Sequence, residues 1–388
     1  MILIVQTRQL EMLPPLISLM RILKTMGERV VYIGLTDTPV ARKVLKEIDV
    51  EHRIYDWPVI TFRERPLLRI WRELTKRIRP IIFRRWVWRQ IDQIAGEERD
   101  VVIWSSEMIS AAILGDRALR YGRRHVQIFY ELGDDIREPT RGFDKKSFYQ
   151  TATIVECEKH RAEIFQGEQN LSVCPFTLPN KPFAHPGTRD LEIHDKAAAQ
   201  AVKQWGEKKV FLYQGALQSD RQDIINLLSW LCEGLPDAVI AVMAKRNELV
   251  DELCQKYSNF SYVPFVAPPA HLDVTSHAHV GLAAYNGKPV HGLSPLNGVY
   301  CAPNKIFEYS GFGIPVLCND IEGLRFTIGA SESGICVGTW DREHVVSAAR
   351  RILNDYERYS ANAVRFFDSV DLTEIVRSIL NHARGRTA

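Results

Sequence analysis

Paired cysteines, long apolar runs and a strong charge of one sign are all missing from this 388-residue sequence. The seven cysteines are scattered and form no C-x-x-C pair, which argues against a disulfide framework or a zinc site and favours a reducing compartment. The formal net charge of +3 is too small to indicate a nucleic-acid-binding protein. The opening run MILIVQT is too short for a signal h-region or a membrane span, so we expect a first β-strand and a cytoplasmic protein.

What the sequence does contain is a repeated alternation of short apolar runs with longer helix-period stretches. Hydrophobic residues make up 46% and charged residues 25%, as in soluble globular proteins, and the length suits two domains. The strand-like runs lie at 2–5, 29–34, 100–106, 125–130, 210–215, 238–244, 260–265, 279–285 and 314–320. Strands that alternate with helices imply parallel, doubly wound sheets. We therefore predict an α/β protein with two Rossmann-like domains facing a cleft.

The alternation is interrupted once, by a polar stretch over 186–208 that contains a Pro-Gly turn. We interpret it as a linker, which gives an N-terminal domain over 1–185 and a C-terminal domain over 209–365. A last helical pattern, 366–388, has no strand after it.

The stretch APNKIFEYSGFGIPVLCND, residues 302–320, predicts a short helix that returns directly into a buried strand. Pro303 suits the first helical position, and Ala302 offers no side-chain oxygen as a cap, so the first N–H groups are free to bind an anion. Lys305 and Glu308 share one face. Lys305 would add a cation for a phosphate, and Glu308 could accept hydrogen bonds from the paired hydroxyls of a ribose. The alternative is a surface ion pair between these two residues.

Two segments of the second half, PNKIFEYSGFGIPVLC and the following NDIEGLRFTIGASESGICV, resemble the nucleotide-sugar-binding motif of GT-B glycosyltransferases, especially the family 4-like group. FLYQGALQSDR looks like the first strand and glycine loop of the family's donor domain, and FVAPPAHLDVTSHAHVGLAAY like the segment that passes the nucleobase. The resemblance covers about 209–340 and implies a UDP-sugar donor, with the N-terminal domain binding the acceptor. The implied donor-binding residues are Gly215, Arg221, Phe265, Asn304, Lys305 and Glu308. For Phe265, a place in the hydrophobic core is the alternative.

One position departs from the pattern of many retaining members, which carry an E-x7-E pair on this helix. Tyr300 stands where the first glutamate would be. The arrangement is more similar to that of the inverting xanthan glucuronosyltransferase, so inversion is favoured over retention.

Inverting transfer needs a general base that deprotonates the acceptor hydroxyl. HVQIFYELGDD, residues 125–135, predicts a strand followed by Glu131, Asp134 and Asp135. A similar strand and loop in the xanthan enzyme carries the catalytic aspartate, and Asp134 falls at the matching place. The alternative is that these carboxylates only solvate a loop.

No metal or other cofactor is expected. The adjacent aspartates do not form a D-x-D motif, and GT-B enzymes usually need no metal. Arg221 and Lys305 would stabilise the leaving diphosphate instead. Three histidines, His271, His277 and His279, lack metal-ligand spacing, and we take them as surface or edge residues.

A basic stretch over 61–91 carries ten Arg or Lys, two Glu and interleaved aromatic residues that include Trp71, Trp86 and Trp88. This composition suits the surface of an anionic membrane, and it contains no nucleic-acid-binding motif. A solvated helix whose arginines lie over core aromatics is the alternative.

The sequence therefore predicts a glycosyltransferase that moves a sugar from a UDP-sugar to a saccharide acceptor, which we expect to be lipid-linked. Such an enzyme would act in the assembly of a cell-surface polysaccharide or glycolipid, at the inner face of the membrane. Two alternatives stay open. One is an isomerase similar to the nucleotide-sugar 2-epimerases, which share the two-domain fold, and the other is a non-catalytic nucleotide-sugar-binding subunit.

Overall fold

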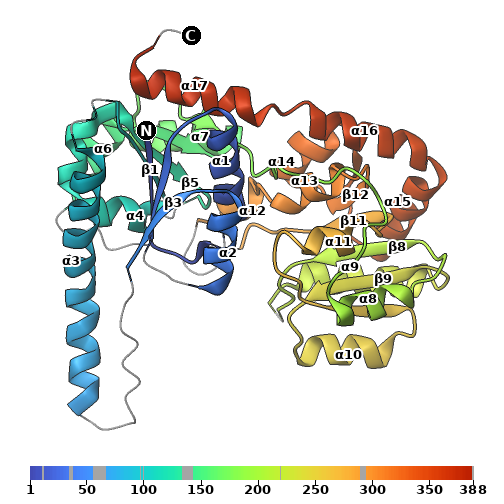
Figure 1. Ribbon diagram of the computed structural model, residues 1–388. Helices are drawn as coiled ribbons and strands as arrows, with labels where there is room; N and C mark the ends of the chain where they lie inside the picture. Colours follow the sequence, from blue (N-terminus) through green and yellow to red (C-terminus); the bar gives the residue numbers. More distant parts are fainter. Residues whose placement is uncertain are drawn as a thin grey trace. The chain divides into compact units, whose positions relative to one another are not determined.

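The computed structural model of the chain forms two compact units (Figure 1). It describes residues 1–10, 13–34, 38–55, 67–96, 98, 100–132, 143–218, 220–288 and 294–386, with side chains of the helix over 67–95 from residue 80 onward. The first unit combines Met1–Pro179 with Leu372–Ala388, and the second is Asn180–Asp371.

The first unit is built on a seven-stranded parallel sheet in the order β3-β2-β1-β4-β5-β6-β7. Its strands are β1 (Ile2–Gln6), β2 (Val30–Gly34), β3 (Glu51–Ile54), β4 (Val102–Ser106), β5 (His125–Phe129), β6 (Thr153–Glu156) and β7 (Phe176–Thr177). Its helices are α1 (Pro14–Thr25), α2 (Pro39–Glu47), α3 (Leu67–Ala95), α4 (Glu107–Leu114), η2 (Asp116–Arg124), α6 (Lys145–Thr151), α7 (Lys159–Gln169) and α17 (Leu372–Arg384). The strand order reverses between β1 and β4.

The second unit carries a six-stranded parallel sheet in the order β10-β9-β8-β11-β12-β13. The strands are β8 (Val210–Gln214), β9 (Val239–Ala244), β10 (Phe260–Pro264), β11 (Val280–Ala283), β12 (Val316–Asn319) and β13 (Gly334–Val337). The helices are α8 (Lys196–Lys203), α9 (Gln222–Gly234), α10 (Glu248–Lys256), α11 (His271–Thr275), α12 (Leu296–Val299), α13 (Asn304–Ser310), α14 (Glu322–Leu324), η3 (Arg325–Gly329), α15 (Arg342–Asn354) and α16 (Tyr356–Asp368). Here the order reverses between β8 and β11. Two parallel α/β domains are thus confirmed.

The polar stretch over 186–208, interpreted as a linker, is part of the second unit. Its helix α8 buries Ala198 and Val202 in the core of that unit, and Trp205 follows them. The indole of Trp205 also donates a hydrogen bond to the Ser261 hydroxyl at 2.9 Å. A few buried residues on one face attach this stretch to the sheet, although its composition is polar.

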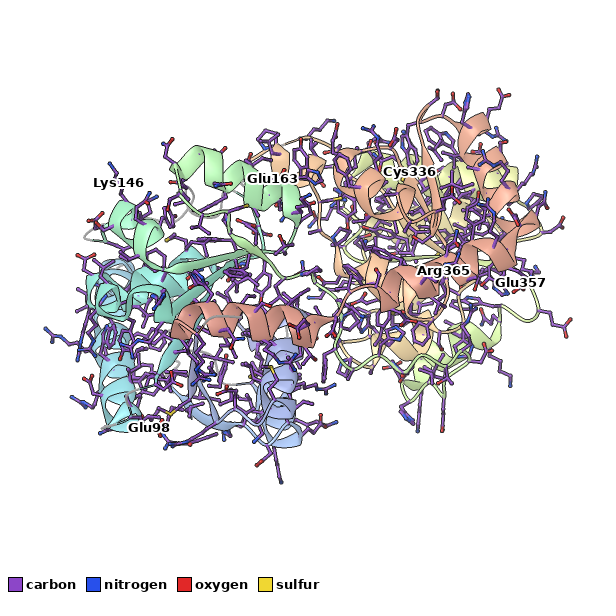
Figure 2. The ribbon with its side chains drawn as sticks, turned by 90° about the horizontal axis from the view of Figure 1, so that it is seen from above. Glu98, Lys146, Glu163, Cys336, Glu357 and Arg365 are labelled. Carbon is purple, nitrogen blue, oxygen red and sulfur yellow. The ribbon has the colours of Figure 1, made fainter. Side chains whose placement is uncertain are left out.

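The last helix, α17, belongs to the first unit, so the segment 366–388 is divided at residue 372. Figures 1 and 2 show α17 lying across the first unit beside α1. Arg384 on α17 binds both carboxylate oxygens of Glu28, at 2.5 and 2.8 Å, and one oxygen of Asp100 at 3.1 Å. The hydrogen bonds from Arg384 lower the pKa of Glu28, so the pair is held in its charged form.

The described part of the basic stretch lies on α3, whose first half extends beyond the sheet of its unit in Figure 1. Phe83 and Trp88 are buried in the core. For these two aromatic residues, the alternative of a helix with aromatic residues in the core is therefore confirmed. The opposite face is exposed and combines apolar and basic side chains at helical spacing, namely Ile81, Ile82, Arg85 and Arg89. Within the part of the chain that the structure describes, no helix is both long and apolar enough to cross a membrane.

Candidate functional site

Helix α13 begins one residue later than the sequence suggested. Pro303 is the N-cap, with an extended backbone and no side-chain capping bond, and Asn304 is the first helical residue. The helix ends at Ser310, and Gly313 makes the return to β12 with a φ of +65° that favours glycine. Ile306 and Tyr309 pack into the core and fix the helix beside the sheet.

Glu308 of α13 is 7% exposed, and both of its carboxylate oxygens are hydrogen-bonded. Gln214, the last residue of β8, donates from its amide to Oε2. His271 Nε2 lies 3.1 Å from Oε1. Gln214 is in turn held by the Thr275 hydroxyl, which donates to its amide oxygen at 2.7 Å. The network joins α13, α11 and the carboxyl end of β8, where the strand order reverses.

The charge of Glu308 is maintained by these partners. Burial alone would raise the pKa of the carboxyl group, but the charges of His271 and Lys305 and the hydrogen bonds from His271 and Gln214 outweigh it, and the pKa is lowered. A buried, ionised carboxylate at this edge is a ready hydrogen-bond acceptor for hydroxyl groups.

Two earlier interpretations are corrected here. A surface ion pair between Lys305 and Glu308 is excluded, because Glu308 is buried and bonded to Gln214 and His271. His271 is not a surface or edge residue, since it is 8% exposed and contacts the buried carboxylate. The sequence placed His271 in a cluster with His277 and His279, but only the fold shows that α11 lies against α13.

Two cations lie near the carboxyl end of β8, and both stand over the ring of Tyr285, with Arg221 at 5.5 Å and Lys305 at 5.7 Å from its centroid. The Lys305 ammonium would lie 3.3 Å from a Cβ built on Gly215, and it stands over the Tyr213 ring at 4.3 Å. Arg221 donates to the carbonyl of Ala284 at 3.1 Å. The φ of Gly215 is +142°, and the lack of a side chain keeps this approach open. Neither cation forms an ion pair with a carboxylate of the described residues.

The pKa of Lys305 is lowered to about 7, first because the ammonium is buried and second because Arg221 repels it. A phosphate group bound beside Gly215 would outweigh both effects, since its negative charge stabilises the ammonium. The pair is therefore suited to a diphosphate.

The remaining donor candidates lie at the same edge of the sheet. Phe265 follows β10 directly and is 51% exposed, so its alternative place in the hydrophobic core is wrong. The ammonium of Lys245 stands 5.7 Å from its ring centroid. Asn304, in the first turn of α13, is half-buried.

In the first unit, Glu131 is half-buried two residues beyond the end of β5. Asp134 and Asp135 lie outside the described residues, so their role stays a prediction from the sequence. Glu131 is thus the one candidate base whose surroundings the structure describes, and it follows a strand near the middle of the parallel sheet.

Solved structures share the whole two-unit architecture at low sequence identity. A glycosyltransferase from Rickettsia africae is 10% identical with a TM-score of 0.61, and the match covers 99% of this chain and 98% of that one. HepE from Anabaena, in complex with UDP and glucose, is 14% identical with a TM-score of 0.61, over 97% of each chain. The chain has the GT-B type of fold.

Nucleotide-sugar epimerases share this fold too. UDP-GlcNAc 2-epimerase from Neisseria meningitidis, bound to UDP-GlcNAc, is 11% identical with a TM-score of 0.53, over 97% of this chain and 98% of that one. The sequence itself matches no protein-family model and no curated protein. The likeness therefore establishes the architecture, and the choice between transfer and epimerisation depends on the residues of the site.

Proposed function

We propose that the protein is a glycosyltransferase that uses a UDP-sugar as donor and a saccharide as acceptor. The observation that carries the proposal is the pair of cations over the Tyr285 ring, Lys305 and Arg221, of which Lys305 also approaches Gly215, together with the buried carboxylate of Glu308. In open α/β sheets, ligands bind outside the carboxyl ends of the strands where the strand order reverses, which is where these residues lie. Structural neighbours in complex with UDP support the nucleotide assignment.

In this proposal, Lys305 and Arg221 bind the diphosphate and neutralise its growing charge as the sugar leaves. Glu308 accepts hydrogen bonds from the ribose hydroxyls, and the exposed ring of Phe265 stacks on the nucleobase. Asp134 takes the proton of the attacking acceptor hydroxyl, with Glu131 and Asp135 as the other candidates. Inversion at the anomeric carbon follows from a single displacement by that hydroxyl.

The second candidate is an epimerase similar to the UDP-GlcNAc 2-epimerases, and the shared fold is the observation that favours it. Incubation with UDP-sugars and a membrane extract separates the possibilities. Sugar transferred to the extract supports the glycosyltransferase, a donor with inverted stereochemistry in the absence of extract supports the epimerase, and UDP-sugar binding without either product indicates a binding subunit.

Replacing Glu308 with alanine is expected to weaken UDP binding by about tenfold or more. Loss of charge-assisted hydrogen bonds to a ribose costs on the order of 1.5–3 kcal/mol. Calorimetric titration with UDP measures the effect. The control is Glu252→Ala on the exposed face of α10, which removes the same charge from the same unit. UDP affinity equal to wild type in a folded Glu308→Ala protein would remove Glu308 from the site.

The second part of the proposal concerns the exposed face of α3. We propose that this face binds the surface of an anionic membrane, which holds the lipid-linked acceptor. Ile81 and Ile82 are 54% and 39% exposed, and Arg85 and Arg89 are exposed beside them. Arg84 does not belong to this face, because its guanidinium donates to the carbonyls of Ile113 and Ala112 at 3.0 and 2.7 Å. An apolar and basic face of this kind suits the headgroup layer of an anionic bilayer.

Replacing Arg85 and Arg89 with glutamine is expected to weaken sedimentation with anionic vesicles by about thirtyfold. Each basic residue near an anionic surface contributes about 1 kcal/mol, and salt screens it. Co-sedimentation in low and high salt measures the effect, with neutral vesicles as the comparison. Arg84→Gln is the matched control, which should lower thermal stability but leave vesicle binding of the folded protein unchanged. Equal sedimentation of wild type and double variant would contradict the membrane contact.

A further inference from the structure

The strand order of the first unit reverses between β1 and β4, and the proposed function assigns no residue to that point. Ligands of open α/β sheets bind at such a reversal, outside the carboxyl ends of the strands. β1 ends at Gln6 and is followed by Thr7 and Arg8, whereas β4 ends at Ser106 and is followed directly by Glu107. Polar and charged side chains thus follow both strands.

Glu107 is in an unfavourable state in two respects. Its φ is +60°, a left-handed backbone that is uncommon for residues other than glycine. Its side chain is also only 2% exposed, so the carboxylate is removed from water and depends on its protein partners. Glycine would relieve the backbone, and a neutral side chain would avoid the buried charge. A left-handed backbone and a buried carboxylate that occur together at a strand reversal indicate a functional role.

One partner of Glu107 is Arg8. Their closest atoms, Glu107 Oε1 and Arg8 Nη1, are 2.7 Å apart. Arg8 is 37% exposed, so its guanidinium reaches from the buried carboxylate to the surface. Because a guanidinium has five N–H donors in a fixed plane, Glu107 can orient Arg8 and leave donors directed at a ligand.

Gln6 supplies an independent observation at the same point. It is fully buried, and its amide oxygen accepts a hydrogen bond from the Ser110 hydroxyl at 3.0 Å. Its amide nitrogen has no hydrogen-bond partner among the residues that the structure describes. A buried donor without a partner is unfavourable, and a ligand oxygen at the end of β1 would satisfy it.

The charges at this edge indicate the chemical class of the ligand. Over the last residue of β1, β4, β5 and β6 and the two residues after each, the charged side chains are Arg8, Glu107, Glu131, Glu156 and Glu158. The buried guanidinium of Arg161 reaches the same edge from α7 and donates to the Tyr130 carbonyl at 3.0 Å. The four carboxylates outnumber the two guanidinium groups, so the described charges disfavour a phosphate or a carboxylate ligand. Hydroxyl groups are not repelled, and they can both donate to carboxylates and accept from Arg8 and Gln6.

We propose that the reversal between β1 and β4 binds a neutral saccharide, with Arg8 donating hydrogen bonds to its hydroxyl oxygens and Glu107 acting as the positioning residue for Arg8. That this saccharide is the acceptor of the transfer rests on the proposed function. The binding site itself does not, because it lies wholly within the first unit.

Saturation-transfer NMR on the full chain tests the site. The probes are neutral p-nitrophenyl glycosides of glucose, galactose, mannose and N-acetylglucosamine, together with glycerol 3-phosphate as the anionic probe. At least one glycoside should bind wild type, and Arg8→Gln should weaken that binding about tenfold or more. The matched control is Arg29→Gln, which breaks an exposed pair with Glu98 (labelled in Figure 2) before the start of β2 and should leave glycoside binding unchanged.

Two variants of Glu107 separate a positioning role from a purely structural one. Glu107→Gln keeps the shape but loses the charge that orients Arg8, and it should weaken glycoside binding several-fold. Glu107→Gly should also weaken binding, because it removes the carboxylate that orients Arg8 although it relieves the backbone. Glycoside affinity equal to wild type in either folded variant contradicts the positioning role.

The site is overturned if no glycoside binds the folded wild-type protein, if Arg8→Gln binds glycosides as wild type does, or if glycerol 3-phosphate binds in an Arg8-dependent manner instead. UDP is titrated in parallel and should bind all variants equally, because its proposed site lies in the second unit. Glycoside binding by a protein that fails to bind UDP would reject the proposed function and support the saccharide site.

Discussion

Loss of both cations over the Tyr285 ring, in the double variant Lys305→Met with Arg221→Gln, is expected to weaken UDP binding by two orders of magnitude or more. Each charged hydrogen bond to the diphosphate contributes about 1.5–3 kcal/mol, and two of them together correspond to at least a hundredfold in affinity. Calorimetry with UDP measures the loss. Lys209→Met with Arg342→Gln is the control, since it removes two exposed charges from the same unit. Binding within threefold of wild type would contradict a diphosphate site at Gly215.

The same site should make UDP binding dependent on pH. Burial and Arg221 lower the pKa of Lys305 to about 7, so the free protein holds a neutral amine above that pH, whereas bound diphosphate favours the ammonium. Affinity should therefore fall as the pH rises through 7, by up to tenfold per unit. Calorimetry at pH 8 in buffers of different ionisation enthalpy should show uptake of nearly one proton. The uptake should disappear in Lys305→Met, and its persistence there would assign the proton to another group.

Turnover is expected to fall by about two to four orders of magnitude when Asp134 is replaced with asparagine. The amide cannot accept the proton of the attacking hydroxyl, which is the contribution of a general base. Measured as sugar transfer from a UDP-sugar, the loss should appear in kcat, and UDP affinity should stay unchanged.

Glu131→Gln and Asp135→Asn are the matched controls for Asp134, because each removes one carboxylate of the same segment. Near-normal turnover in Asp134→Asn together with a large loss in one control would move the base to that residue. Near-normal turnover in all three would favour a retaining mechanism, in which the acceptor needs no such side chain.

The alternation of apolar runs and helical patterns was sufficient to predict the fold class, because a strand buried on both faces reads as a continuous apolar run. Buried strands such as β1 and β8 fall where the pattern placed them. The alternation of apolar runs and helical patterns shows only which short segments are buried, and it does not show which elements pack against one another. The polar stretch over 186–208 was expected to hold a solvated helix, and the pattern did not show that α8 packs into the second unit through one buried face, Ala198 and Val202.

The donor-site candidates were also found from the sequence where they lie on one helix, as Lys305 and Glu308 do. Their partners were not, because Gln214 and His271 come from other elements, 94 and 37 residues before Glu308 in the chain. Glu107 shows a second limit of prediction from the sequence. Its significance depends on a backbone angle and on a contact with Arg8, and no residue pattern encodes either of them.

The return of α17 to the first unit has a consequence for synthesis on the ribosome. The chain leaves this unit after Pro179 and comes back only at Leu372, so the ion pairs of Arg384 with Glu28 and Asp100 cannot form until the whole second unit has been translated. At about 5–20 residues per second, the intervening segment takes roughly 10–40 s. During that time the surface of α1 that α17 covers is open to other chains, and the nascent first unit is a natural client for a chaperone.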